Sequence, residues 1–184
     1  MTWPVGTTVH FQVLAIAPVP KGSHKAFVVR APDTKIGYRA VITDEKNPEL
    51  KEWESRLRAE AGAELERRGR PMLRDRPCEV QLVLCLVRPR GDFSPATGKL
   101  LGSARLTPWV KPDVDKLQRT IFDALTSCVI DDDSRIVRVV VEKRYVESAA
   151  KAGVAVRVIA LAATVREEAE ICARSSSSTA PTAP

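Results

Sequence analysis

Residues 111–145 read KPDVDKLQRTIFDALTSCVIDDDSRIVRVVVEKRY. Within this stretch, residues 116–127 are predicted to form a helix, and residues 135–145, rich in β-branched side chains, a strand. Two further β-prone runs lie outside it, at residues 78–88 and 153–165. With the N-terminal segments, the order is strands, helix, strand, helix, strands. This order predicts an α+β fold with one mixed sheet and two main helices.

The N-terminal part of the chain is predicted to contain three strands. Residues 7–16 form the first, and residues 26–30 and 36–42 flank a turn at Pro32-Asp33, which predicts a hairpin. Residues 1–42 contain five Lys or Arg and one acid, a net charge of +4. This basic segment either contacts DNA phosphates or is an ordinary solvated surface.

A long helix is predicted to begin at Asn47-Pro48-Glu49. Asn caps free backbone N–H groups, Pro is tolerated at the first helical position, and Glu suits the positive end of the helix dipole. Gly69 is expected to end the helix. Apolar residues recur along it at three- and four-residue steps and predict a core-facing side: Leu50, Trp53, Leu57, Ala61 and Leu65.

Two segments lack the pattern of regular structure. Residues 89–108 contain three prolines, three glycines and several polar residues, and are predicted to form an irregular loop. Residues 174–184 read RSSSSTAPTAP, a low-complexity stretch that is predicted to be a disordered tail. The sequence therefore predicts one domain, residues 1–173, followed by this tail.

The composition favours a globular protein with anionic partners. The chain has 184 residues, of which 44% are apolar, enough to form a core. Its net charge of +6 favours nucleic acid or an acidic membrane surface as a partner. No apolar run approaches the ~20 residues of a membrane span, and the N-terminus lacks a secretory pattern. We therefore expect neither a membrane span nor a secretion signal.

The rarer residues exclude several kinds of site. Two histidines, His10 and His24, cannot build a zinc site of several histidines, and a histidine-dependent triad is not expected. The cysteines form no CxxC pair, and a disulfide framework is not expected in a chain of this length without a secretion signal. Four free thiols, three of them in or near the core, are predicted: Cys78, Cys85, Cys128 and Cys172.

Residues 111–145 concentrate acidic side chains in a basic chain. Asp113 and Asp115 are two residues apart, so in an extended segment both carboxylates would face the same side. Asp115 is also a suitable N-cap for a helix starting at Lys116. The triplet Asp131–Asp133 follows this helix, and we expect its chain to return near the first pair so that two or three carboxylates converge.

Converging carboxylates suit a divalent metal. Like charges a few ångströms apart repel each other unless a cation lies between them. Mg²⁺ takes one or two carboxylates, waters and phosphate oxygens, and it can activate water and neutralise a scissile phosphate. Arg119, four residues after Asp115, and the nearby Lys111 and Lys116 would stabilise phosphate charge. Spacing alone leaves open a plainer interpretation, with the acids as a helix cap and polar turns and Asp123 as a surface acid.

Three parts of this stretch resemble, in order, the signature of the RusA family of Holliday-junction resolvases. They are Pro112–Lys116 (PDVDK), the helical Leu117–Leu125 with its Asp-Ala-Leu end, and Asp132–Val137 (DDSRIV). Ile42–Trp53 resembles the family's first-helix region, and the layout agrees over residues 7–165. The resemblance implies a RusA-like fold in a small homodimer that, with Mg²⁺, cuts four-way DNA junctions at symmetric positions.

The resemblance also implies roles for individual residues. The family's essential aspartates match Asp113, Asp115 and Asp133, which would hold Mg²⁺ and perform catalysis, and Asp132 matches a neighbouring acid that would assist with the metal. The family's helix lysine falls on Arg119, a catalytic candidate. Basic residues near these positions and in the N-terminal segment are the candidates for DNA binding: Lys111, Lys116, Lys21, Lys25 and Arg135.

Three positions depart from the family pattern. Arg119 replaces the family's lysine, which keeps the charge but excludes proton donation near neutral pH. Lys116 replaces an asparagine, and Arg135 replaces a glutamine. These changes bear on rate and sequence preference more than on reaction class.

The resemblance therefore implies a bacterial or phage-encoded, Mg²⁺-dependent endonuclease that resolves Holliday junctions by paired phosphodiester hydrolysis in DNA recombination and repair. It also implies a cytoplasmic location and no membrane partner. Two alternatives remain open. One is a non-catalytic DNA-binding protein of the same fold, and the other is a metal-dependent phosphohydrolase that acts on nucleotides or RNA. Trp109, just before the acidic motif, either stacks on a base at the junction or packs inside the protein.

Overall fold

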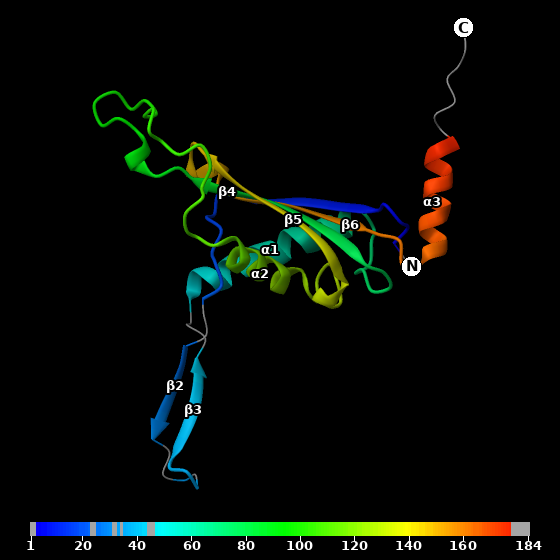
Figure 1. Ribbon diagram of the computed structural model, residues 1–184, viewed down its shortest axis with the longest axis horizontal. Helices are drawn as coiled ribbons and strands as arrows, with labels where there is room; N and C mark the ends of the chain where they lie inside the picture. The colour runs from blue at the N-terminus through cyan, green and yellow to red at the C-terminus, as the bar shows by residue number, and fades with distance from the viewer. Residues whose placement is uncertain (1–2, 23–24, 31–32, 34, 44–46, 178–184) are drawn as a thin grey trace.

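A four-stranded sheet forms the body of the molecule (Figure 1). The computed structural model describes residues 3–22, 25–30, 33, 35–43 and 47–177. The strands, in spatial order, are β1 (Thr8–Leu14), β6 (Gly153–Ala160), β4 (Cys78–Val87) and β5 (Ile136–Val146). β4 and β5 are parallel and the other neighbours are antiparallel, so the sheet is mixed, as predicted.

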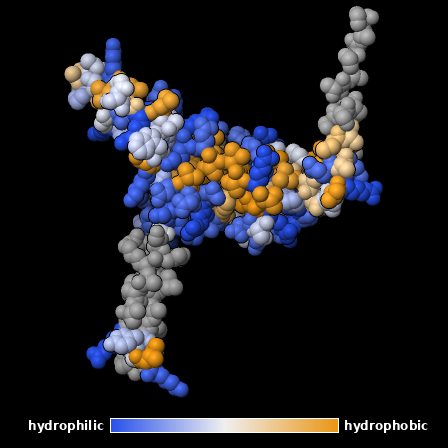
Figure 2. Space-filling view, in the orientation of Figure 1, coloured by the Kyte–Doolittle hydropathy of each residue, from blue (hydrophilic) through white to orange (hydrophobic). Residues whose placement is uncertain are grey.

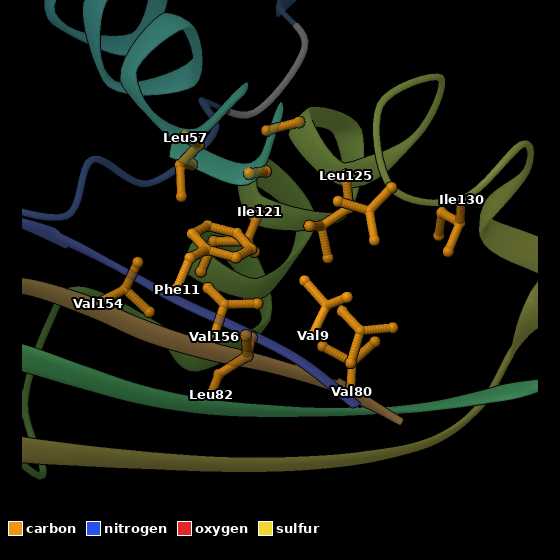
Figure 3. Close-up of a cluster of buried hydrophobic side chains, with 14 of the residues drawn as sticks. Val9, Phe11, Leu57, Val80, Leu82, Ile121, Leu125, Ile130, Val154 and Val156 are labelled. Carbon is orange, nitrogen blue, oxygen red and sulfur yellow. The ribbon is translucent and has the colours of Figure 1, made fainter. Parts of the chain in front are cut away.

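Two helices, α1 (Pro48–Arg67) and α2 (Val114–Leu125), pack on one face of this sheet (Figure 3). Successive strand residues point to opposite faces, and every second residue of β1, β4 and β6 is buried under the helices. Burying each such side chain contributes about 1.5–3 kcal/mol. The core labelled in Figure 3 comprises Val9, Phe11, Leu57, Val80, Leu82, Ile121, Leu125, Ile130, Val154 and Val156.

The first helix, α1, has the N-cap and the buried face that the sequence predicted. The Asn47 side chain accepts a hydrogen bond from the Glu49 amide at 3.0 Å, and Pro48 occupies the first turn. The predicted face is buried from Trp53 onward, while Leu50 is only half-buried. Gly69, with φ of +59°, follows the helix end in a conformation that favours glycine.

The two predicted strands of the hairpin are also present, and Pro32 of the predicted turn lies outside the described residues. β2 (Lys25–Arg30) pairs antiparallel with β3 (Tyr38–Thr43) in a separate two-stranded sheet. The hairpin extends away from the body (Figure 1). No helix in the described part of the chain is long and apolar enough to cross a membrane.

The last strand ends earlier than predicted. β6 ends at Ala160, five residues before the predicted end, and a third helix, α3 (Val165–Ser177), follows. The Glu167 amide donates to the Thr164 hydroxyl at 3.2 Å, and the Glu167 carboxylate accepts from the Ala163 amide at 2.7 Å. This reciprocal cap starts the helix. Its last turn includes residues 174–177 of the predicted tail, and residues 178–184 lie outside the described part of the chain.

The connection between β4 and α2 is a folded arm, which we define as residues 88–111. It contains a 3-10 turn, η1 (Arg90–Asp92), and a bridge between Phe93 and Leu100. The Leu101 amide donates to the Asp92 carbonyl at 2.9 Å. The predicted irregular loop therefore has a backbone hydrogen-bond pattern of its own. Two further 3-10 turns, η2 (Asp133–Arg135) and η3 (Ala149–Lys151), precede β5 and β6.

The cysteines are free thiols, as predicted. Cys78 is buried, Cys85 and Cys128 are half-buried, and Cys172 is exposed. Burial raises the pKa of the Cys78 thiol to about 11, so this group stays protonated and unreactive near neutral pH.

Candidate active site

Two carboxylates lie at the exposed N-terminal end of α2. The helix begins at Val114, two residues earlier than predicted, so Asp113 rather than Asp115 is the N-cap residue. Asp113 has extended backbone angles after Pro112, whereas Asp115 lies in the first helical turn. Free N–H groups and the helix dipole stabilise negative charge there. The Asp115 side chain has no hydrogen-bond or ion-pair partner among the described residues, and Asp113 lies 3.6 Å from the Lys116 ammonium.

Lys143 fixes the backbone that leads into Asp113. Its ammonium donates to the carbonyl oxygens of Val110 at 2.9 Å and Pro112 at 3.1 Å. Lys143 pairs with buried Leu84 in the β4–β5 register, so it lies on the helix-facing side of the sheet. The sequence interpretation missed this residue. A lysine at a core-facing strand position was the available signal, because lysine is rarely buried without partners.

Beside Asp113 the surface is hollowed into an open depression of about 320 Å³. Lys111 and Lys116 contribute to its wall together with Pro20, Pro112 and Asp113. Two ammonium groups beside a carboxylate can hold a phosphate oxygen while the carboxylate binds a cation.

The second acidic group occupies η2 and the residues before it. The Asp132 side chain accepts from the Ser134 amide at 2.8 Å and caps η2, and hydrogen bonds from Ser134 lower the pKa of Asp132. Asp131 forms a two-bond pair with Arg135 at 3.0 and 3.1 Å, which lowers the pKa of Asp131. Asp133 is exposed and has no side-chain partner among the described residues. Asp133 is therefore the member of the triplet that is open to a ligand.

The two acidic groups lie at opposite ends of α2, so the predicted convergence does not occur within one chain. The twelve residues of α2 span about 18 Å. The strand β5 gives a similar distance between the two acidic groups. Lys143 contacts the backbone next to Asp113, and Ile136 follows η2 directly. These two strand residues are seven positions, or about 23 Å, apart. No cluster of three metal-ligating side chains occurs in the described ranges. The prediction failed because α2 runs from the far end of β4 back to the start of β5 (Figure 1).

The predicted cations divide into paired and unpaired groups. Arg119 is exposed one turn after Asp115, and Lys111 is exposed at the edge of the depression; neither side chain has a partner among the residues that the structure describes. Lys21 instead pairs with Asp123 on α2 and holds the N-terminal segment against this helix. Arg135 is engaged by Asp131. Lys25 lies in β2, where only the backbone is described.

Trp109 does not pack inside the protein. Its side chain is 73% exposed, and the Arg105 guanidinium lies 5.3 Å from the ring centroid. One face of the indole is thus next to a cation, which is a favourable cation–π arrangement.

A family model described as Endodeoxyribonuclease RusA matches residues 9–158. The chain belongs to the RusA family. This family consists of hydrolases that cut DNA internally and resolve Holliday junctions, and its nucleases are generally dependent on a divalent metal. The match includes the hairpin, the arm, α2 and η2, and it excludes α3. None of the curated proteins compared with the chain matches it.

Proposed function

We propose that this RusA-family chain is a Mg²⁺-dependent endonuclease that resolves Holliday junctions as a homodimer during DNA recombination or repair. The observation that carries the proposal is the family match over a segment whose carboxylates are exposed and available. The side chains of Asp115 and Asp133 are exposed and have no partner among the described residues. Carboxylates without a side-chain partner are suited to a ligand.

The donor set fits a hard divalent cation. Asp113, Asp115 and Asp133 offer carboxylate oxygens, which Mg²⁺ prefers, and Asp132 adds another beside Asp133. These four residues would hold the ion. When bound, Mg²⁺ activates a water molecule and neutralises charge on the phosphate. Arg119 would stabilise the extra phosphate charge in the transition state by electrostatics alone, because its guanidinium stays protonated.

Because the two acidic groups are far apart in one chain, a shared metal site requires a second copy of the chain. A single chain cannot place Asp113 and Asp133 on one ion, because they lie at opposite ends of α2. A two-fold axis that brings η2 of a second copy beside the start of α2 would create two identical composite sites. Two symmetric sites suit a four-way junction, in which two strands are cut at equivalent positions.

The first experiment tests the activity itself. A synthetic four-way junction, labelled on one strand at a time, is incubated with the protein with and without ~10 mM Mg²⁺, a choice that saturates a site of few protein ligands. A linear duplex of the same sequence is the control. We expect paired, symmetric nicks only with the junction and the metal. Tight binding without cleavage would favour the non-catalytic protein, and turnover of RNA or small phosphodiesters without junction preference would favour another phosphohydrolase.

The second experiment tests the composite site. Asp113→Asn and Asp133→Asn chains, each expected to be inactive, are refolded together so that mixed dimers form. In a mixed dimer one composite site keeps both wild-type aspartates and the other keeps neither. We expect nicking of one strand to return in the mixture. If each site belonged to a single chain, the mixture would remain inactive.

A further inference from the structure

The arm, residues 88–111, is held at both ends by specific contacts. At its start, the Arg88 guanidinium donates to the Asp92 carboxylate at 3.1 Å and to the Arg105 carbonyl at 2.6 Å, and it lies 4.3 Å from the Tyr145 ring centroid. At its end, Lys143 binds two carbonyl oxygens next to Asp113. These contacts fix the base of the arm while its remainder extends from the body (Figure 1).

Positive charge is concentrated in this arm. It contains five Lys or Arg and one acid, Asp92, so its net charge is +4. Residues 1–42 also have a net charge of +4, whereas the whole chain has +6. The rest of the molecule is therefore net negative, at −2. The basic character of the protein lies in two separate segments, and the arm ends directly at the candidate active site.

The arm also exposes large apolar side chains. Leu106 is 90% exposed and Trp109 is 73% exposed, and Leu100 and Val110 add further apolar surface. Figure 2 shows hydrophobic and hydrophilic residues side by side on this projection. A folded segment that leaves such side chains in water is typical of an interaction surface.

We propose that the arm binds the branch point of four-way DNA, with its cations on backbone phosphates and with Trp109 and Leu106 against bases that are unstacked there. This inference rests on the proposed function and adds the surface that selects branched over linear DNA. Aromatic rings stack on any exposed base face, and a continuous duplex offers none. The selectivity therefore comes from the apolar side chains, and the affinity comes mainly from the cations.

Charge identifies DNA as the occupant rather than a second copy of the chain. Two arms facing each other would each bring +4, and like charges that meet across an interface oppose association. A nucleic acid brings the opposite charge and, at a branch, exposed aromatic faces. The arm leads directly to Asp113, so a branch point held by it would place a backbone phosphate near the carboxylates.

The test measures binding without cleavage, with Ca²⁺ in place of Mg²⁺. Fluorescence anisotropy gives the Kd for a four-way junction and for a linear duplex of the same sequence. We expect Trp109→Ala to weaken junction binding about tenfold, the effect of losing one stacked base, and to change duplex binding less than about twofold. Trp109→Phe, which keeps a ring, should restore most of the junction affinity. Leu106→Ala should likewise lower the affinity for the junction more than that for the duplex. Val165→Ala, at an exposed apolar position outside the arm, is its matched control.

A second pair of variants tests the cations. Arg90 and Lys99 are exposed in the arm. Replacing both with glutamine should reduce the slope of log Kd against log salt concentration for the junction by the amount expected from the loss of about two phosphate contacts. The control replaces Lys151 and Arg166, which are exposed and lie outside the arm. A 2-aminopurine base at the branch point reports stacking directly, and we expect its fluorescence to change with wild-type protein but not with Trp109→Ala.

The outcomes separate this inference from the proposed function. Equal losses on junction and duplex, or no loss with Trp109→Ala and Leu106→Ala, would overturn the role of the arm even if cleavage occurs. A change of oligomeric state in these variants, measured by sedimentation, with unchanged DNA selectivity would assign the arm to contact between copies instead. Junction selectivity that depends on Trp109 in a protein that never cleaves would uphold the arm and refute only the nuclease.

Discussion

The buried face and the N-terminal end of α2 differ in almost every physical respect. The face is formed by Leu117, Ile121, Ala124 and Leu125, all of them buried against the sheet and α1. The end exposes Asp113 and Asp115, which contribute little packing. One short helix therefore serves both the fold and the candidate site, and mutations should separate the two roles.

The largest expected effect is on cleavage, from Asp115→Asn. Loss of one carboxylate of the proposed metal site should lower the cleavage rate roughly 10³-fold. Stability should fall by less than about 1 kcal/mol, because only a favourable charge at the helix N-terminus is lost. Junction-cleavage rates and urea unfolding of the same preparation check both parts. Cleavage at the wild-type rate would remove Asp115 from the site.

The converse change is Ile121→Ala on the buried face. It removes core volume and should destabilise the protein by about 2–5 kcal/mol. Under conditions where the variant is folded, its cleavage rate should remain near that of the wild type. Gln118→Ala, half-buried on the same helix, is the control and should change stability by roughly 0.5 kcal/mol or less. A large loss of activity in folded Ile121→Ala would show that the two roles of α2 cannot be separated.

A smaller effect is expected from Lys143→Met. The Lys143 side chain connects strand β5 with the N-terminal end of α2. Without the ammonium, the carbonyls of Val110 and Pro112 lose their donor, and the chain entering Asp113 is held less firmly. The Mg²⁺ concentration for half-maximal cleavage should rise about tenfold, as is typical when a supporting contact of a metal site is lost. Lys151→Met, at an exposed position, is the control. An unchanged Mg²⁺ requirement would limit Lys143 to a packing role.

The smallest effect concerns an acid that serves stability. Near the end of α1, hydrogen bonds from Arg67 and Arg68 lower the pKa of Glu64 to about 2. Because the folded pKa lies below its usual value of 4.5, Glu64 stabilises the fold above about pH 4.5 and loses this contribution as the pH falls towards 2. Glu64→Gln should therefore cost less than about 1 kcal/mol at pH 6 and still less at pH 3. Urea midpoints at the two pH values measure this, and an equal cost at both would contradict the assignment.

Much of the fold followed from local patterns in the sequence. The cap at Asn47, the spacing from Trp53 to Leu65 and the β-prone runs at residues 26–30 and 36–42 predicted α1 and the hairpin correctly, because each signal acts within a few residues. α3 was missed because its first turn continued an apolar run and its end looked like low-complexity tail. Thr164 and Glu167, three residues apart, were the capping signal that predicts it.

The candidate site was less predictable for a different reason. The residue types around Asp113 and Asp133 indicated metal chemistry, but their distance depends on the direction in which α2 crosses the sheet. That direction is a property of the whole topology, which spacing does not reveal. Lys143 was missed for the same reason, since its partners, Val110 and Pro112, lie about 30 residues earlier in the chain.

The position of the arm within the topology has a consequence for engineering and for divergence among relatives. The arm lies in the crossover between β4 and the parallel strand β5, and its two ends are fixed by Arg88 and Lys143. Its length can therefore change without shifting a strand register or moving the start of α2. Residues 94–98, within the turn that the Phe93–Leu100 bridge closes, should accept an inserted tag. If the arm binds DNA as proposed, a graft from another member should change DNA preference without moving the carboxylates at the start of α2.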